Sequence, residues 1–80
     1  MDTSTSLYQL ISQIAQIDQK QIDSNTHLIN DLGFDSINMI TLIVQIEEKF
    51  NILLNDEDLD LELLSKVKNL EGIVNDKTRG

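Results

Sequence analysis

The 80-residue chain contains no cysteine, no proline and no tryptophan. Without cysteine it has no disulfide framework, no thiolate metal site and no cysteine nucleophile, and this composition fits a reducing compartment. The polar start of the chain, residues 1–6, lacks the basic and apolar regions of a signal peptide. No stretch approaches the roughly 20 apolar residues of a membrane span. We therefore expect a cytoplasmic protein.

Positive charge is also scarce. Lys and Arg total 6 against 14 Asp and Glu, which gives a formal net charge of −8. Such a chain repels nucleic acid and anionic lipid, so we expect neither nucleic acid nor a membrane as a partner. Nine of the acids lie between residues 31 and 62, where Lys49 is the only base. This local field predicts partner proteins with basic docking patches, and we expect the chain itself to be a monomer.

The first half of the chain shows two helical patterns separated by a long polar segment. Apolar residues at three- and four-residue spacing predict a helix over about residues 6–17, with Ser4 or Ser6 as its cap. Residues 18–33 lose this period but keep several apolar side chains, which indicates a long loop held against a core. A second helix follows over about residues 36–50. Because loops of this length are usually functional, the segment at the end of this loop is a candidate site.

The second half predicts two more helices. A short one begins at Asn55 or Asp56, and a last one is capped by Ser65 and has Gly72 as its weak point. No strand pattern or internal repeat is present. The sequence thus predicts an all-α protein, a small four-helix bundle with a long loop between helices 1 and 2 and a short third helix. We expect a single domain over residues 1–80, with its core at about 6–75 and a polar tail at 76–80.

The expected second helix has a very wide apolar arc, which places it at the centre of the bundle. Its polar residues occupy about one third of the helical wheel at 100° per residue. We expect the core to take Ile40, Ile43, Ile46 and Phe50. Ile37, Met39 and Val44 are the candidates for short-lived apolar contacts with partners, and burial is the alternative for each of them.

The long loop ends in a segment whose residues could take part in chemistry, Asn30-Asp31-Leu32-Gly33-Phe34-Asp35-Ser36-Ile37. Gly33 permits a tight turn, and Asp35 is placed to cap the helix that follows. Ser36 is then the first residue of that helix. A hydroxyl at this place meets unpaired backbone N–H groups and the positive end of the helix dipole, which favour a phosphate. From geometry alone, a simple Asp-Ser cap is the more economical interpretation.

The longer string resembles the acyl and peptidyl carrier protein family. The resemblance runs from about Leu7 to Val74 and is carried by residues 31–37 together with Leu42, Glu47-Glu48, Phe50, Asp56-Glu57 and Leu59. It implies that Ser36 is esterified to 4′-phosphopantetheine, which a phosphopantetheinyl transferase takes from coenzyme A. The protein would then be a carrier and not an enzyme. It would hold acyl or aminoacyl groups as thioesters for loading and condensing enzymes.

Departures from the family pattern bear on the pathway. Fatty-acid carriers usually have acidic residues at the positions of Asn38 and Thr41. Peptidyl carriers usually have the motif L-G-G-[DH]-S, and Phe34 stands at the position of its second glycine. We therefore predict a discrete carrier of a specialised polyketide or nonribosomal peptide pathway. One alternative is the acyl carrier of a fatty-acid synthase. Another is an acidic helical adaptor that is never modified.

The resemblance also directs attention to the second helix as a docking surface. The candidate docking residues there are Ile37, Met39, Thr41, Val44, Glu47 and Glu48. Apolar members would make brief contacts, while the acids would steer basic partners, an effect that acts mainly on association rate and weakens with salt.

Other chemistries fit the sequence poorly. His27 is the only histidine and Ser36 does not lie in a G-x-S-x-G elbow, so a hydrolase triad is not indicated. A calcium loop starting at Asp56 would need a glycine at Leu61 and a glutamate at Val67. We predict no metal site.

Overall fold

The computed structural model describes residues 3–55 and 59–79, and this part of the chain is helical with no β-strand. The all-α class is confirmed. The expected bundle helices are α1, α3, α4 and α5, and the expected long loop holds a short 3-10 helix and one further short helix, α2. In chain order the elements are α1 (Thr3–Ala15), η1 (Gln19–Gln21), α2 (Leu28–Leu32), α3 (Ser36–Phe50), α4 (Leu61–Leu64) and α5 (Val67–Arg79).

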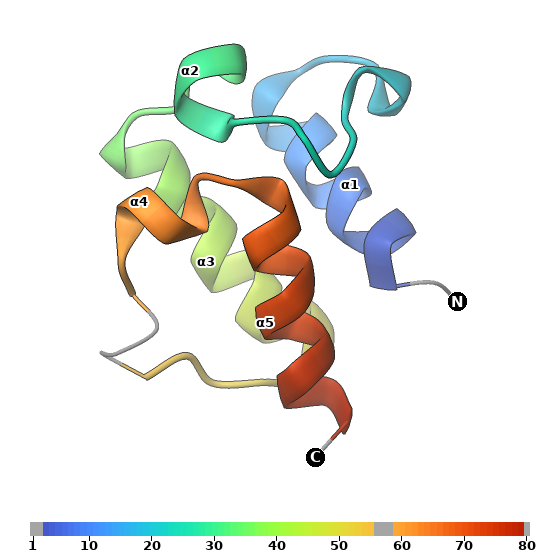
Figure 1. The fold of residues 1–80 in the computed structure, drawn as a ribbon, viewed down its shortest axis with the longest axis vertical. Coiled ribbons are helices and arrows are strands. Elements are labelled where there is room, and N and C mark those ends of the chain that lie inside the picture. The colour runs from blue at the N-terminus through green and yellow to red at the C-terminus, as the bar shows by residue number, and fades with distance from the viewer. Residues whose placement is uncertain (1–2, 56–58, 80) are drawn as a thin grey trace.

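α1 packs against both α3 and α5, and α4 packs against α5. Figure 1 shows α2 at the end of the bundle where α3 and α5 begin, reached from α1 by the long connection. None of the helices in the described ranges has the length and apolar character needed to cross a membrane.

The core forms where the apolar stripes of α1, α3 and α5 meet. Each stripe repeats at three or four residues, so that one face of each helix points inward. A fully buried Leu or Ile contributes about 1.5–3 kcal/mol relative to an exposed one. The fully buried apolar side chains are Leu7, Ile11, Leu28, Met39, Leu42, Ile46, Leu64 and Val67, with Leu70 and Val74 almost so.

The segment between α1 and α3 is held against this core, as the sequence predicts. Ile22, Leu28 and Thr26 are buried. Its backbone is also joined to the junction of α4 and α5: Leu28 N–H donates to Ser65 O at 2.6 Å, and Val67 N–H donates to Thr26 O at 3.1 Å. The start of α2 is thereby fixed to the far end of the sequence.

The predicted cap of α1 is wrong. Because α1 begins at Thr3, both Ser4 and Ser6 lie within it. Ser4 Oγ instead donates to Glu71 Oε2 of α5 at 2.6 Å, and Ser6 is buried. Ser4 thus joins α1 to α5, a role that depends on a residue 67 positions away and leaves no local sign in the sequence.

The start of the short helix also differs from the prediction. α4 begins at Leu61 and is capped by Asp60, whose carboxylate accepts the N–H groups of Glu62 and Leu63. Of the expected starting residues, Asp56 lies outside the described residues. Ser65 ends α4 and does not cap α5. Several acids in one stretch can each serve as an N-cap, so the sequence alone does not choose among them.

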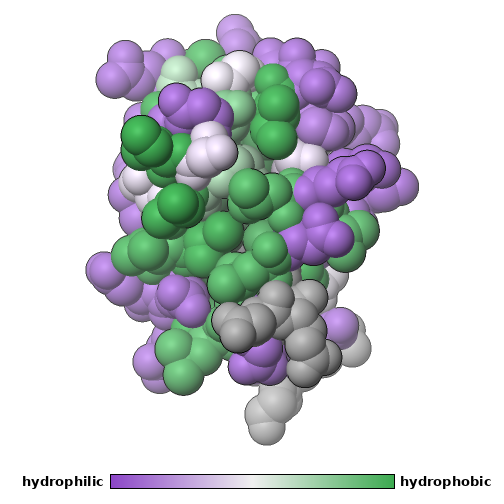
Figure 2. Space-filling model, turned by 90° about the vertical axis from the view of Figure 1, so that its left-hand side faces the viewer, coloured by the Kyte–Doolittle hydropathy of each residue, from purple (hydrophilic) through white to green (hydrophobic). Residues whose placement is uncertain are grey.

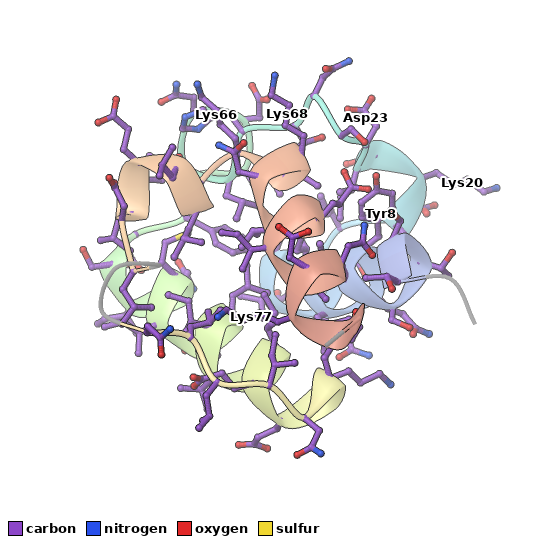
Figure 3. All side chains as sticks on the ribbon, turned by 60° about the horizontal axis from the view of Figure 1, so that its bottom comes forward. Tyr8, Lys20, Asp23, Lys66, Lys68 and Lys77 are labelled. Carbon is purple, nitrogen blue, oxygen red and sulfur yellow. The ribbon has the colours of Figure 1, made fainter. Side chains whose placement is uncertain are left out.

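Glu71 of α5 receives three hydroxyl groups from the other side of the bundle. Besides Ser4, these come from Tyr8 of α1 at 3.2 Å and from Ser24 of the loop at 2.7 Å. Figure 3 shows Tyr8 where α1 approaches α5. Burial raises the pKa of Tyr8 above its ordinary value, and the negative charge of Glu71 adds to this effect. One carboxylate therefore joins α1, the loop and α5.

Candidate functional site

The turn before α3 is built by Gly33. Its backbone is left-handed, with φ 73° and ψ 24°, and ends α2. A Cβ at this position would meet no atom within 4 Å, so glycine is needed for the backbone conformation and not for space. The next N–H group, that of Phe34, donates to Leu28 O at 3.0 Å, and the Phe34 ring is buried. The predicted tight turn is confirmed.

Asp35 caps α3, also as predicted. Its Oδ1 accepts the N–H of Asn38 at 2.8 Å, while Asn38 Oδ1 accepts the N–H of Asp35 at 3.2 Å. Together these two bonds form a capping box. Asn38, one of the departures from the fatty-acid carrier pattern, therefore has a local structural role.

Ser36 is the first residue of the 15-residue helix α3, and its side chain is exposed. The buried Phe34 on one side and the capping box on the other fix the backbone that carries the hydroxyl. A helix N-terminus favours a negative group, because its N–H groups and dipole point at it. The exposed hydroxyl thus fits a phosphate ester, with room outside the fold for a group attached to it.

In the part of the chain that the structure describes, no side chain bonds to the Ser36 hydroxyl to activate it as a nucleophile. The single histidine is occupied: His27 Nδ1 accepts the N–H of Asn30 at 3.0 Å, and its Nε2 lies 3.2 Å from Ser65 Oγ. Within residues 3–55 and 59–79, no group of His, Asp and Glu could hold a metal ion.

The structure leaves most of the candidate docking residues accessible. The exposed fractions of Ile37 and Val44 are 72% and 44%. Thr41 and Glu48 are also exposed, and Thr41 Oγ1 donates to Ile37 O at 2.9 Å. Glu47 is half-buried, and its Oε2 accepts the N–H of Leu54 at 3.0 Å. Glu47 thus also holds the chain that follows α3.

Two assignments on α3 are wrong. Met39, expected among the surface contacts, is fully buried, whereas Ile40, expected in the core, is 58% exposed. Ile43 and Ile46 are buried as predicted, and Phe50 is half-buried against the core. The inward face of α3 is therefore rotated relative to the prediction, towards Met39.

Sequence reasoning also missed the apolar side chains of the chain before and within α4. Leu59, Leu61 and Leu63 are exposed along with Ile40. Figure 2 shows apolar atoms gathered across the side of the molecule where α3 and α4 lie. A run of leucines at mixed spacing predicts burial, so only the tertiary arrangement reveals that these side chains face solvent.

Comparison with known proteins identifies the family. The family model described as "Phosphopantetheine attachment site" matches residues 5–74. An acyl carrier protein of Cyanidium caldarium is 35% identical over 68 residues, which cover 85% of this chain and 77% of that protein. An acyl carrier protein of Buchnera aphidicola is 36% identical over 70 residues, covering 88% of this chain and 86% of that protein. The chain therefore belongs to the acyl carrier proteins, a family of carriers, not enzymes, whose prosthetic group is 4′-phosphopantetheine.

Proposed function

We propose that Ser36 bears the 4′-phosphopantetheine group and that the chain carries acyl or aminoacyl groups on it between enzymes. The observation that supports this is the exposed hydroxyl of Ser36 at the start of α3, inside the family's motif. Asp35 and Gly33 support the site by fixing the helix start and the turn. The thiol of the prosthetic group holds its cargo as a thioester. A chain without cysteine has no side-chain thiol of its own for this purpose.

The partners of this carrier are a phosphopantetheinyl transferase and the enzymes that load and condense its cargo. Docking is proposed to involve α3, where Ile37, Thr41 and Val44 offer uncharged contacts and Glu48 an exposed charge. Basic patches on the partners would complement the acids. The same acids repel a second copy of the chain, which favours a monomer. We place the carrier in the cytoplasm, where coenzyme A and the transferase would meet it.

The pathway is proposed to be specialised polyketide or nonribosomal peptide synthesis. The support is the first half of α3, where the exposed residues after Ser36 are uncharged, with Thr41 and Ile40 among them. Enzymes that recognise acids at these positions would find none. The second candidate is fatty-acid synthesis, and the observation that favours it is that the relatives above are named acyl carrier proteins without further qualification.

The attachment is tested by intact-mass measurement after incubation with coenzyme A, a divalent metal and a promiscuous phosphopantetheinyl transferase. The wild type should gain one phosphopantetheine and Ser36→Ala should gain nothing. Ser24→Ala is the matched control, because Ser24 is also an exposed serine of the described chain and should leave the modification intact. An unmodified wild type would favour the helical adaptor, and a modified Ser36→Ala would move the site to another residue.

The pathway is tested by complementation. A cell lacking its fatty-acid carrier is supplied with this chain and with the double variant Asn38→Asp with Thr41→Glu. Specialised recognition predicts that the wild type fails to support growth, while growth restored by the wild type would establish the fatty-acid alternative. Asp can replace Asn38 because its carboxylate also accepts hydrogen bonds in a capping box.

A further inference from the structure

His27 occupies an unusual place for a histidine, since its side chain caps a helix. Its Nδ1 accepts the N–H of Asn30 at 3.0 Å, at the start of α2. On the other side of the ring, Nε2 lies 3.2 Å from the hydroxyl of the fully buried Ser65, which in turn donates to Glu62 O at 2.7 Å. The imidazole therefore bridges α2 and the end of α4.

These bonds define which nitrogen of the neutral ring carries the proton. An acceptor at Nδ1 must have a free lone pair, so the proton of the neutral imidazole is on Nε2 and is donated to Ser65 Oγ. In the imidazolium both nitrogens carry protons. The Nε2 bond survives protonation, but Nδ1–H would then face the N–H of Asn30. Protonation therefore breaks one particular bond, the cap of α2.

The cap of α2 is connected to the attachment turn through the backbone. The two N–H groups that build the turn, those of Gly33 and Phe34, donate to Ile29 O at 3.1 Å and to Leu28 O at 3.0 Å. Both acceptors belong to the first turn of α2. α2 has only five residues. If its first turn opens, no further turn remains to hold these two carbonyl groups in place.

Charged groups face His27 from each neighbouring element. In α2, Asp31 Oδ2 accepts the His27 N–H at 2.8 Å. Lys66, at the junction of α4 and α5, pairs with His27 in an antiparallel backbone bridge. Lys68 of α5 and Ser24 line the same groove of about 190 Å³ as His27, and Figure 3 shows both lysines at this end of the fold.

We propose that His27 is a positioning residue for Ser36, and that protonation of its imidazole releases the start of α2 and loosens the turn that presents the serine. This rests on the proposed function of Ser36. The wild-type carrier thus presents its hydroxyl best while the imidazole is neutral.

His27→Asn provides the decisive variant. Asparagine is among the best N-caps, and its Oδ1 can accept the N–H of Asn30 without titrating. Two quantities are measured between about pH 7.5 and about pH 5.5. One is the backbone amide resonance of Asn30 by NMR, and the other is the rate at which a phosphopantetheinyl transferase modifies each protein. Taking the ratio of the two rates at each pH removes the pH dependence of the transferase itself.

In the wild type, the Asn30 resonance should shift together with the titration of the His27 ring, and it should not shift in His27→Asn. The rate ratio of His27→Asn to wild type should rise roughly fivefold on acidification, the change expected from loss of a helix cap. Ser65→Ala removes the Nε2 contact and the bond to Glu62 O but leaves the Nδ1 cap of α2, so it should keep the pH dependence of the wild type. Three results would each overturn the proposal. They are an Asn30 resonance that does not shift as the His27 ring titrates, a rate ratio that stays constant with pH, and a modification rate of Ser65→Ala that lacks the pH dependence of the wild type. Absence of modification at every pH would instead count against Ser36, because the NMR measurement does not depend on it.

Discussion

The two sides of the bundle treat apolar and polar side chains in opposite ways. Where α1 meets α5, the apolar side chains are buried, and hydroxyl groups of three residues converge on Glu71. On the side of α3 and α4, apolar side chains lie in solvent: Ile37, Ile40, Val44, Leu59, Leu61 and Leu63 are all exposed. On the first side, the polar groups bond to other groups of the same chain. The second leaves apolar surface exposed to solvent, and a contiguous exposed apolar patch is a feature typical of interaction sites.

α3 carries both buried and exposed apolar side chains, which shows that the difference depends on the direction in which each side chain points. Leu42 and Ile46 point inward and are fully buried, while Ile37 and Val44 on the same helix are exposed. The composition of a helix therefore does not tell whether its residues stabilise the fold or remain free for contacts. Substitutions at neighbouring positions of α3 provide the direct test.

The largest effect is expected for Ile43→Ala. This side chain is buried in the core cluster, and truncating a buried Ile costs roughly 2–5 kcal/mol in the free energy of unfolding. The matched control is Ile40→Ala, the same substitution on an exposed side chain, which should change it by less than about 0.5 kcal/mol. Urea denaturation measures both. Equal losses in the two variants would remove the distinction between the two sides of α3.

A smaller loss is expected for Glu71→Ala, which tests the polar half of the comparison. The substitution leaves the hydroxyls of Ser4, Tyr8 and Ser24 without their common acceptor. Loss of hydrogen bonds to a charged group costs about 1–3 kcal/mol. Glu62→Ala, on an exposed side chain of α4, should stay near the wild type. If both variants unfold at the wild-type urea concentration, the Glu71 cluster does not hold α1 to α5.

Local signals predicted much of this fold. The periodicity of the apolar residues predicted α1, α3 and α5, and a capping residue followed by acids pointed to the short fourth helix, although not to its start. The Gly33 turn and Asp35 cap follow from conformational preferences of single residues. Each of these features is fixed by residues within a few positions of one another. Ser36 and its supporting turn also lie in one continuous string, and the resemblance of that string to the carrier proteins, rather than its geometry, is what leads to the proposal that Ser36 is the attachment site.

The features that sequence reasoning missed depend on distant parts of the chain. α2 has five residues, too few for a periodic pattern, and its first residue is held by a backbone bond to Ser65, at the junction of α4 and α5. Met39 and Ile40 are both apolar, and which of them is buried depends on where the neighbouring helices lie against α3. Ser4 lies within α1 and bonds to Glu71, 67 positions along the chain. None of these choices leaves a local pattern.

On the exposed side, we expect Val44→Ala to lower the rate of transferase modification a few-fold while changing the free energy of unfolding by less than about 0.5 kcal/mol. Glu48→Gln should also lower this rate, and added salt should slow the wild type more than Glu48→Gln, because salt screens the attraction of the missing charge. Both side chains are exposed. Stopped-flow or quenched assays with fluorescent coenzyme A measure the rate. A large loss of stability in Val44→Ala would assign this residue to the core.

The smallest effect concerns the pH dependence of the α1–α5 side, which Tyr8 reports. Burial, with the charge of Glu71, raises the pKa of Tyr8 in the folded protein above the ordinary value of 10.0. Folding therefore disfavours the tyrosinate, so the stabilisation linked to Tyr8 is complete below pH 10 and is lost as the pH rises through the folded-state pKa.

Tyr8→Phe removes the titrating group and also the hydroxyl that bonds to Glu71. We expect the wild type to be the more stable of the two at neutral pH and this advantage to shrink steadily at alkaline pH, as measured by urea denaturation at a series of pH values. Lysine deprotonation affects both proteins equally and cancels in the difference. Because Tyr8 is the only tyrosine of the chain, its absorbance gives an independent titration curve. A difference in stability that stays constant while this curve rises would show that the hydroxyl is not held between α1 and α5.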